Sequence, residues 1–183
     1  MADKSSFIIP ENLSFEEALQ VSQALLEGMV EGSLNTAEVQ QAIAHLVSSG
    51  NGARGFFVVY LSEPRSLADE STSAVIEALK TSPGTISSLL VKNLAMSTAM
   101  ATAHRRNHNE EQALGSDRVQ ARTLHLIQHL QTLELKEHAI ALCQTLDGTS
   151  SSYQSFLERW GYDQEQQQAI RQVLGQTNLL ETH

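Results

Sequence analysis

Histidine and carboxylate side chains between residues 104 and 111 have the spacing of a metal site. His104 and His108 are four residues apart, and Glu111 follows three residues later. If one helix continues through all three, they lie on one face within an arc of ~60°. Two imidazoles and one carboxylate can bind iron, zinc or manganese and leave coordination positions open. This spacing predicts one alternative for the function, a metal-dependent helical enzyme.

The same segment also has the composition of a helix end. Arg105 and Arg106 directly follow His104, and cations in a last helical turn complement its exposed carbonyl groups and the negative end of the helix dipole. Asn109 has the position of a cap for a new helical turn, which would rotate Glu111 away from the histidines. Because such histidine spacings are common by chance, we favour the helix end over the metal site.

A basic strip is predicted on the helix that follows. Its side chains fall on one flank within an arc of ~60°, beside the apolar stripe: Arg118, Arg122, His125 and His129. Arg105 and Arg106 complete the candidate interaction residues. The strip fits either a solvated edge or a surface that contacts an acidic protein partner or an anion. The acidic first helix, in the same chain or in a second copy, is one such partner.

The overall charge argues against two classes of partner. Among 183 residues, 21 are acidic and 12 are basic, which gives a formal net charge of −9. Binding to nucleic acid or to an anionic membrane surface depends on lysine and arginine. We therefore expect neither nucleic acid nor membrane as a partner, and no cofactor is predicted.

Cysteine usage and hydropathy predict a compartment. Cys143 is the single cysteine, which excludes an internal disulfide and a zinc site built on cysteine pairs. The first twelve residues lack the basic start and long apolar middle of a secretory signal. No uncharged apolar run reaches the ~18 residues that a membrane-spanning helix needs. These features predict a soluble cytoplasmic protein.

Two helices are predicted at the start of the chain. Ser14 and Glu17 have the spacing of a capping box, and apolar residues at helical spacing continue to about Glu31. A second helix is expected to begin at Asn35 or Thr36. The segments "NLSFEEALQVSQALLEGMVEG" and "NTAEVQQAIAHLVSSG", together residues 12–50, form this pair.

This helix pair resembles the one that opens the small helical domain of anthranilate phosphoribosyltransferase-type enzymes. The resemblance covers residues 12–50, and the remainder of the chain has no recognised counterpart. The glycine-rich phosphate-binding segments of that family are absent downstream, and the chain is too short for its α/β domain. The resemblance therefore implies a helical interaction or dimerisation unit and no transferase activity.

The segment "GFFVVYLS", residues 55–62, is rich in β-branched and aromatic side chains. It fits either a strand, which would need a partner strand, or a buried helix. We expect at most a short two-stranded element near residues 56–61. The preceding "GNGARG", residues 50–55, matches a dinucleotide-binding pattern, but it follows a helix and precedes the candidate strand, the reverse of the required order. We expect a loop there.

The middle of the chain predicts a helical hairpin over residues 85–133. A central helix is expected from Thr85 to His108, a break at Gly115, and a second helix from about Asp117 to Leu133. The C-terminal helices follow over residues 134–175. A pocket beside the central helix would suit a small ligand, and its residues would be Met96, Met100 and His104.

The sequence thus predicts an all-α protein, a single-domain bundle of about seven helices over residues 1–183. Its favoured function is a non-enzymatic cytoplasmic interaction or regulatory protein, a homodimer whose contact surface is the Arg/His-rich hairpin. The metal-dependent enzyme is the second alternative, and a small-ligand-binding helical protein is the third.

Overall fold

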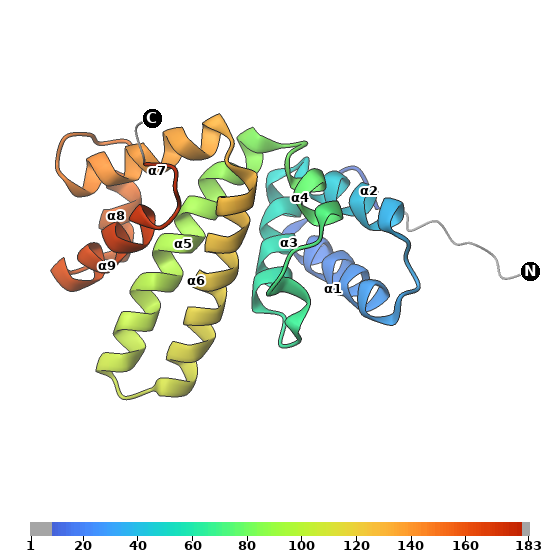
Figure 1. Cartoon of the computed structure of the whole chain (residues 1–183), viewed down its shortest axis with the longest axis horizontal. Helices are drawn as coiled ribbons and strands as arrows, with labels where there is room; N and C mark the ends of the chain where they lie inside the picture. The colour runs from blue at the N-terminus through green and yellow to red at the C-terminus, as the bar shows by residue number, and fades with distance from the viewer. Residues whose placement is uncertain (1–8, 181–183) are drawn as a thin grey trace, which may run out of the picture. The chain divides into compact units, whose positions relative to one another are not determined.

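The computed structural model describes residues 9–180 of the chain. Within that range the regular secondary structure is entirely helical, so the all-α class is confirmed (Figure 1). Nine α-helices and one short 3-10 segment are present among the described residues, where about seven helices were predicted. Their bounds are α1 Phe15–Glu31, α2 Thr36–Val47, α3 Gly50–Ser62, η1 Ser66–Ala68, α4 Ser73–Leu79, α5 Pro83–Arg106, α6 Glu110–Leu130, α7 Leu133–Leu146, α8 Gln154–Trp160 and α9 Gln164–Gly175.

The chain divides into two compact units. Of the described residues, 9–86 form the first unit and 87–180 the second. The predicted helix pair, residues 12–50, lies within the first unit, and the C-terminal helices lie within the second. The single domain of the sequence analysis stays a prediction, because units of this size can also fold cooperatively as one domain.

The first two helices begin as predicted. Ser14 is the N-cap of α1, with its hydroxyl accepting from the amide of Glu17 and the Glu17 carboxylate accepting from the amide of Ser14. Asn35 and Glu38 make the same reciprocal pair at the start of α2. Each pair satisfies two amide groups that have no partner inside the helix.

Residues 50–62 form helix α3, so of the two alternatives for residues 55–62 the buried helix is confirmed, and the loop expected at "GNGARG" was wrong. Ser49 caps α3 by accepting from the amide of Gly52 at 3.1 Å. Phe56, Phe57 and Tyr60 are buried. Side chains that favour strands also suit a fully buried helix, and a helix satisfies its backbone within one segment and needs no partner strand.

Gly55 explains why α1 and α3 pack closely. A Cβ atom at residue 55 would lie 2.6 Å from the Cβ of Ala18 and 2.8 Å from its carbonyl carbon. The absence of a side chain therefore allows the α3 backbone to approach α1. The apolar core of the first unit has among its largest fully buried side chains Leu25, Leu26, Ile43, Leu46, Phe56 and Leu79.

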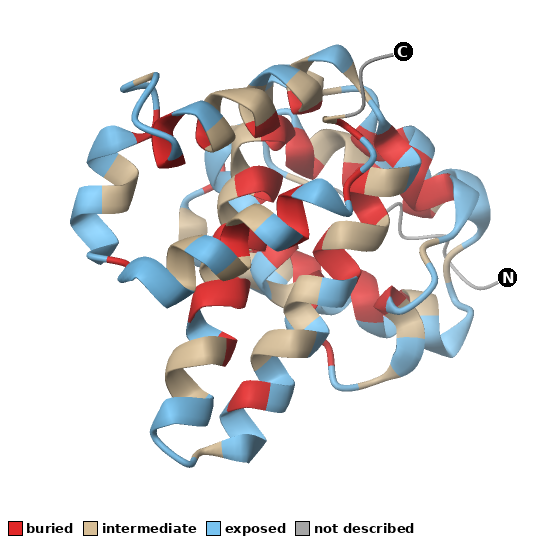
Figure 2. Cartoon of the chain, turned by 60° about the vertical axis from the view of Figure 1, so that its left-hand side comes forward, coloured by how far each residue is buried: buried red, intermediate tan, exposed pale blue. Residues whose placement is uncertain are grey.

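In the second unit, α5 and α6 form the predicted antiparallel hairpin (Figure 1). The Gln120 side-chain amide donates to the Thr98 hydroxyl at 2.8 Å, and Arg105 binds Asp117 nearer the turn. These pairs have the register of antiparallel neighbours. Figure 2 shows that the end of the hairpin, at the bottom of the view, carries mostly exposed and half-buried residues.

The hairpin turns earlier than predicted. Helix α5 ends at Arg106 instead of His108, and α6 begins at Glu110 and continues through Gly115, where a break was expected. The turn is fixed by His108, whose φ of 54° is left-handed, and by Asn109, which accepts from the amide of residue 112 at 3.2 Å. A strong cap can thus start a helix upstream of an interior glycine, whose cost is only about 1 kcal/mol.

The three C-terminal helices complete the second unit. Thr132 caps α7, Gly161 ends α8 with a left-handed φ of 58°, and Asp163 caps α9. Buried apolar residues of α7 follow helical spacing, and α7 packs against α9. Between residues 9 and 180, none of the helices combines the length and the apolar character that crossing a bilayer requires.

Candidate functional site

The structure does not assemble the residues of the proposed metal site. That hypothesis required one helix through His104, His108 and Glu111, but α5 ends at Arg106 and Asn109 starts a new helix. The left-handed backbone of His108 breaks the common face. Across residues 9–180, no group of three or more histidine, cysteine, aspartate or glutamate side chains is placed to hold a metal ion.

The first two arginines of the candidate interaction residues are engaged inside the chain. Arg105 binds Asp117 on α6 and lies 3.7 Å from a carboxylate oxygen of Glu110. Arg106 binds Asp163 and Glu165 at the start of α9. Both guanidinium groups have raised pKa values because of these hydrogen bonds. They hold the hairpin and α9 together, so their charges are largely matched internally.

The rest of the basic strip is not one exposed edge. Arg122 is only 2% exposed, because it shares the inward face of α6 with Leu126 and is surrounded there by the protein. His125 is half-buried, and its ring centroid lies 4.1 Å from that of His129. Arg118 and His129 are the exposed members.

A cavity of about 420 Å³ lies in the second unit, and its lining differs from that of the predicted ligand pocket. Met96, Met100 and His104, the predicted ligand-pocket residues, do not line it. The cavity is bounded by α5, by α7 and by the start of α8. Its lining residues are Ser88, Lys92, Glu137, His138, Ala141, Ser152, Tyr153, Ser155 and Phe156.

Local sequence places four polar side chains at this cavity, two of them on α5. Ser88 and Lys92 are one helical turn apart on α5, so both project from the same face. His138 lies beside the buried residue Ala139 of α7. Tyr153 immediately precedes α8, and its backbone amide donates to the hydroxyl of Thr145 at 3.2 Å. That bond fixes the loop that returns from α7.

The centre of the site is the contact between His138 and Tyr153. Nδ1 of His138 lies 2.7 Å from the phenol oxygen of Tyr153, and the two rings meet edge to face with centroids 6.0 Å apart. Ser88 also hydrogen-bonds the phenol. With Ser88 donating to the oxygen, the phenol proton is directed to Nδ1. Three side chains from three elements therefore share one hydrogen-bond network.

Burial and charge set the protonation of this network. Tyr153 is 6% exposed, and burial raises its pKa to about 12. Burial also lowers the pKa of His138, the positive charge of Lys92 lowers it further, and Glu137 opposes both. The phenol is therefore protonated and the imidazole neutral at pH 7. Both side chains act as hydrogen-bonding groups and carry no charge.

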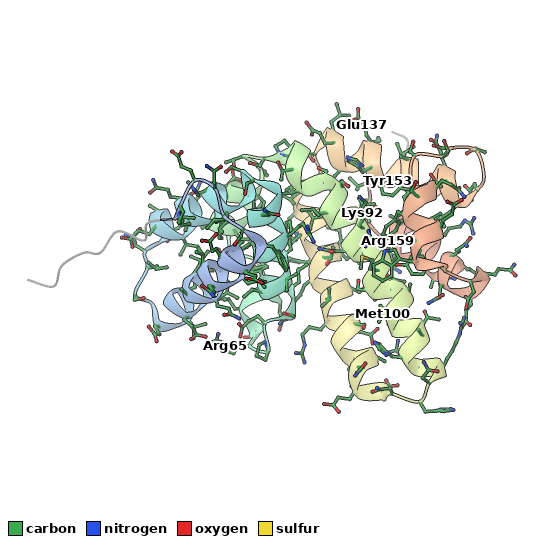
Figure 3. All side chains as sticks on the ribbon, turned by 180° about the vertical axis from the view of Figure 1, so that it is seen from behind. Arg65, Lys92, Met100, Glu137, Tyr153 and Arg159 are labelled. Carbon is green, nitrogen blue, oxygen red and sulfur yellow. The ribbon has the colours of Figure 1, made fainter. Side chains whose placement is uncertain are left out.

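Two charged residues line this cavity, Lys92 and Glu137. Glu137 is exposed, so Lys92 supplies the charge of the cavity interior. Its Nζ lies 5.9 Å from the centroid of the Tyr153 ring, within the range of a cation–π contact. Figure 3 shows Lys92 and Tyr153 close together, with Glu137 further out on α7. Lys92 is half-buried, and no carboxylate oxygen of the described residues lies within salt-bridge distance of it.

A second, more open cavity of about 860 Å³ lies in the first unit between α1 and α3. Its charged residues already bind one another, with one guanidinium between two carboxylates. Arg65 donates to Glu27 at 2.8 Å and to the buried carboxylate of Glu63 at 2.5 Å. Arg65 lowers the pKa of Glu27 through this hydrogen bond. A ligand would have to compete with these contacts, so this groove is the weaker candidate.

The cavity in the second unit was not predicted from the sequence, although one signal for it was present. Lys92 is the only charged residue between Lys80 and Arg105, within a largely apolar helix. A single charged residue in such a helix is typical of a functional site or of a buried ion pair. His138 and Tyr153 lie fifteen residues apart across a loop, and no spacing rule predicts that contact.

Comparison with known proteins gives one match. Residues 14–177 match the model of a family described as uncharacterised conserved protein UCP020893. Neither the curated proteins nor the solved structures contain a significant match to the chain.

Proposed function

The chain belongs to the family of uncharacterised conserved proteins UCP020893, and within that family we propose that it acts as a small-molecule-binding helical protein. The binding site is the cavity between α5, α7 and α8. This proposal corresponds to the third alternative of the sequence analysis, at different residues.

One observation carries the proposal, the hydrogen-bonded pair of His138 and Tyr153 beside Lys92. Known ligand sites are cavities of roughly 300–1,000 Å³ with apolar walls and a few convergent polar groups. The cavity here has a volume of about 420 Å³. Phe156 and Ala141 provide apolar walls, and the polar groups converge from three helical elements. Such convergence favours recognition of one small molecule over nonspecific contact.

The site also differs from its surroundings in how its polar groups are used. Several arginines of the chain bind carboxylates of the same chain, as Arg65, Arg106 and Arg171 do. The ammonium of Lys92 has no such partner in the part of the chain that the structure describes. A half-buried ammonium without a carboxylate partner loses part of its hydration, which costs free energy, and a ligand would offset that cost.

A thermal-shift screen of the full-length protein against a panel of small metabolites of mixed charge tests this proposal. A ligand that binds only the folded state raises Tm in proportion to the logarithm of its concentration. Ser155, on α8, is exposed and lines the cavity, whereas Ser151, in the loop just before α8, is exposed and does not. We expect Ser155→Trp to abolish the Tm shift and Ser151→Trp to preserve it. An equal shift in both variants, or no shift in the wild type, contradicts the proposal.

A second candidate function is self-association or binding to an acidic protein in the cytoplasm. It is favoured by one feature of α6, where Leu114 is 56% exposed one turn before Arg118. Arg118 has no carboxylate within salt-bridge distance among residues 9–180. Exposed carboxylates of α1, such as Glu16 and Glu31, would complement it in a second copy. Light scattering on a sizing column tests this candidate, with Arg118→Glu expected to convert a dimer to a monomer.

A further inference from the structure

We infer that the ligand of the cavity between α5, α7 and α8 is a small organic molecule with one compact anionic group, a phosphate or a carboxylate, received by Lys92, Ser88 and His138. The inference rests on the proposed small-molecule function and names the ligand class. It requires that the cavity present a cation, hydrogen-bond donors and an apolar wall to the same molecule.

The cation is Lys92. It is half-buried and approaches the Tyr153 ring with Nζ 5.9 Å from the centroid. The ring holds the ammonium at the wall of the cavity by its electron-rich face. A compact anion beside Nζ would form a charge-assisted hydrogen bond, which is about twice as strong as a neutral one.

The donors come from the network around Tyr153. Ser88 is one helical turn from Lys92 on the same face of α5, so its hydroxyl can turn from the phenol to an anionic oxygen. His138 lies across the cavity on α7 and is tied to Tyr153 by the 2.7 Å hydrogen bond. An anion between α5 and α7 would therefore meet side chains from both walls.

The apolar wall is aromatic. Tyr153 and Phe156 meet edge to face with centroids 6.1 Å apart, and both line the cavity. Inorganic ions alone would leave this wall in contact with water. A molecule that joins an anionic group to a ring or a short carbon skeleton would cover it, and a volume of about 420 Å³ accepts a molecule of that size.

Binding of an anion is coupled to a proton at His138. The charged groups that face His138 are Lys92 from α5 and Glu137 on α7, and Tyr153 at the start of α8 is its neutral neighbour. In the free protein burial and, after it, the charge of Lys92 lower the pKa of the imidazole. An anion offsets the charge of Lys92 and so raises the pKa of His138, which couples binding to proton uptake at this residue. Affinity therefore increases as the pH falls.

The probes for the test are benzoate, phenyl phosphate and benzyl alcohol, each titrated into the ¹⁵N-labelled full-length protein and followed by NMR. We expect one or both anions to shift the amide signals of residues 88, 92, 138 and 153, and the neutral alcohol to bind at least tenfold more weakly. A preference for benzoate or for phenyl phosphate identifies the anionic group. Lys92→Gln should weaken anion binding about tenfold or more.

Lys136 gives a matched control, because it is a half-buried lysine of α7 outside the cavity lining. Lys136→Gln should leave anion binding unchanged. Benzoate keeps a constant charge between about pH 6 and 8, since carboxyl pKa values lie near 4, so its tighter binding at pH 6 would report the proton at His138.

The outcomes separate the two proposals. Equal binding of benzyl alcohol and the anions, or anion binding that Lys92→Gln does not weaken, overturns the anionic class and leaves small-molecule binding in place. Failure of both anions to bind also overturns the anionic class. If, in addition, no compound of the metabolite panel shifts Tm, the proposed function fails as well.

Discussion

Arg106, at the last residue of α5, donates to both carboxylate oxygens of Asp163, the residue that caps α9. One carboxylate oxygen of Asp163 also accepts from the amide of Gln166 at 3.0 Å. The contact joins residues 57 positions apart in the chain. From the sequence, Arg106 was a candidate for contact with another protein. In the structure it fixes the start of α9 in its own unit.

Replacing Arg106 with glutamine should lower Tm, because the Asp163 cap and Glu165 lose their bound guanidinium. The loss should be greatest at low ionic strength, since both groups are partly exposed and salt screens their attraction. Arg159→Gln is the control, because Arg159 is exposed on α8 and no ion pair joins it to a carboxylate among the described residues. Equal Tm changes in the two variants, measured by circular dichroism, would contradict the structural role of Arg106.

The same contact predicts an acid-dependent loss of stability. Arg106 holds the pKa of Asp163 well below its ordinary value of 3.8. A depressed carboxyl pKa contributes stability that is present above the unfolded value and is lost as the pH falls below it. The difference in Tm between wild type and Arg106→Gln should therefore shrink as the pH is lowered from 5 to below 3.8. A constant difference would exclude this linkage.

The charge of Lys92 should be visible in the titration of His138. Burial and Lys92 lower the pKa of His138 below 6.5, so the native state holds fewer protons than the unfolded state and loses stability as the pH falls through that range. Lys92→Met should raise the pKa, and Glu137→Gln should lower it. NMR titration of the imidazole checks both directions. Shifts of the same sign in the two variants would show that these charges do not face His138.

Packing along α5 predicts effects of very different size at two adjacent residues. Ala99 is 0% exposed, and its carbonyl accepts from the side chain of Gln166 at 3.0 Å, whereas Met100 is 42% exposed. Ala99→Leu should destabilise the fold by about 1–3 kcal/mol through overpacking. Met100→Leu should change the unfolding free energy by less than about 0.5 kcal/mol. Urea denaturation measures both, and an unchanged value for Ala99→Leu would mean that α5 is not tightly packed there.

Two interior helical glycines should respond in opposite directions to alanine. At Gly55 a Cβ would collide with Ala18 at 2.6 Å, whereas at Gly115 no heavy atom lies within 4 Å. Gly55→Ala should cost about 1–3 kcal/mol, because the backbone of α1 must move. Gly115→Ala should stabilise by about 0.4–1 kcal/mol by reducing the freedom of the unfolded chain. The same urea measurements apply, and stabilisation by Gly55→Ala would contradict the close contact of α1 and α3.

The sequence by itself determined the helical class and several helix ends. Capping boxes at Ser14 and Asn35 place the starts of α1 and α2 correctly, because a capping box satisfies backbone amides within four residues and needs no distant partner. The α5–α6 hairpin was predictable for a similar reason, since two apolar helices joined by a short turn pack as neighbours. Local interactions carry all of these features.

Tertiary structure alone decided what the charged and aromatic side chains do. Residues 55–62 favour strand by composition, but burial of Phe56 and Tyr60 inside the first unit makes them helical. Arg122 is buried and Arg106 is bound to α9, although the pattern of each suits an exposed edge. The contact of His138 with Tyr153 joins α7 to α8 across a loop. Distances between residues far apart in the chain depend on how helices pack, and helical periodicity gives only the face on which a residue lies, never the partner it meets.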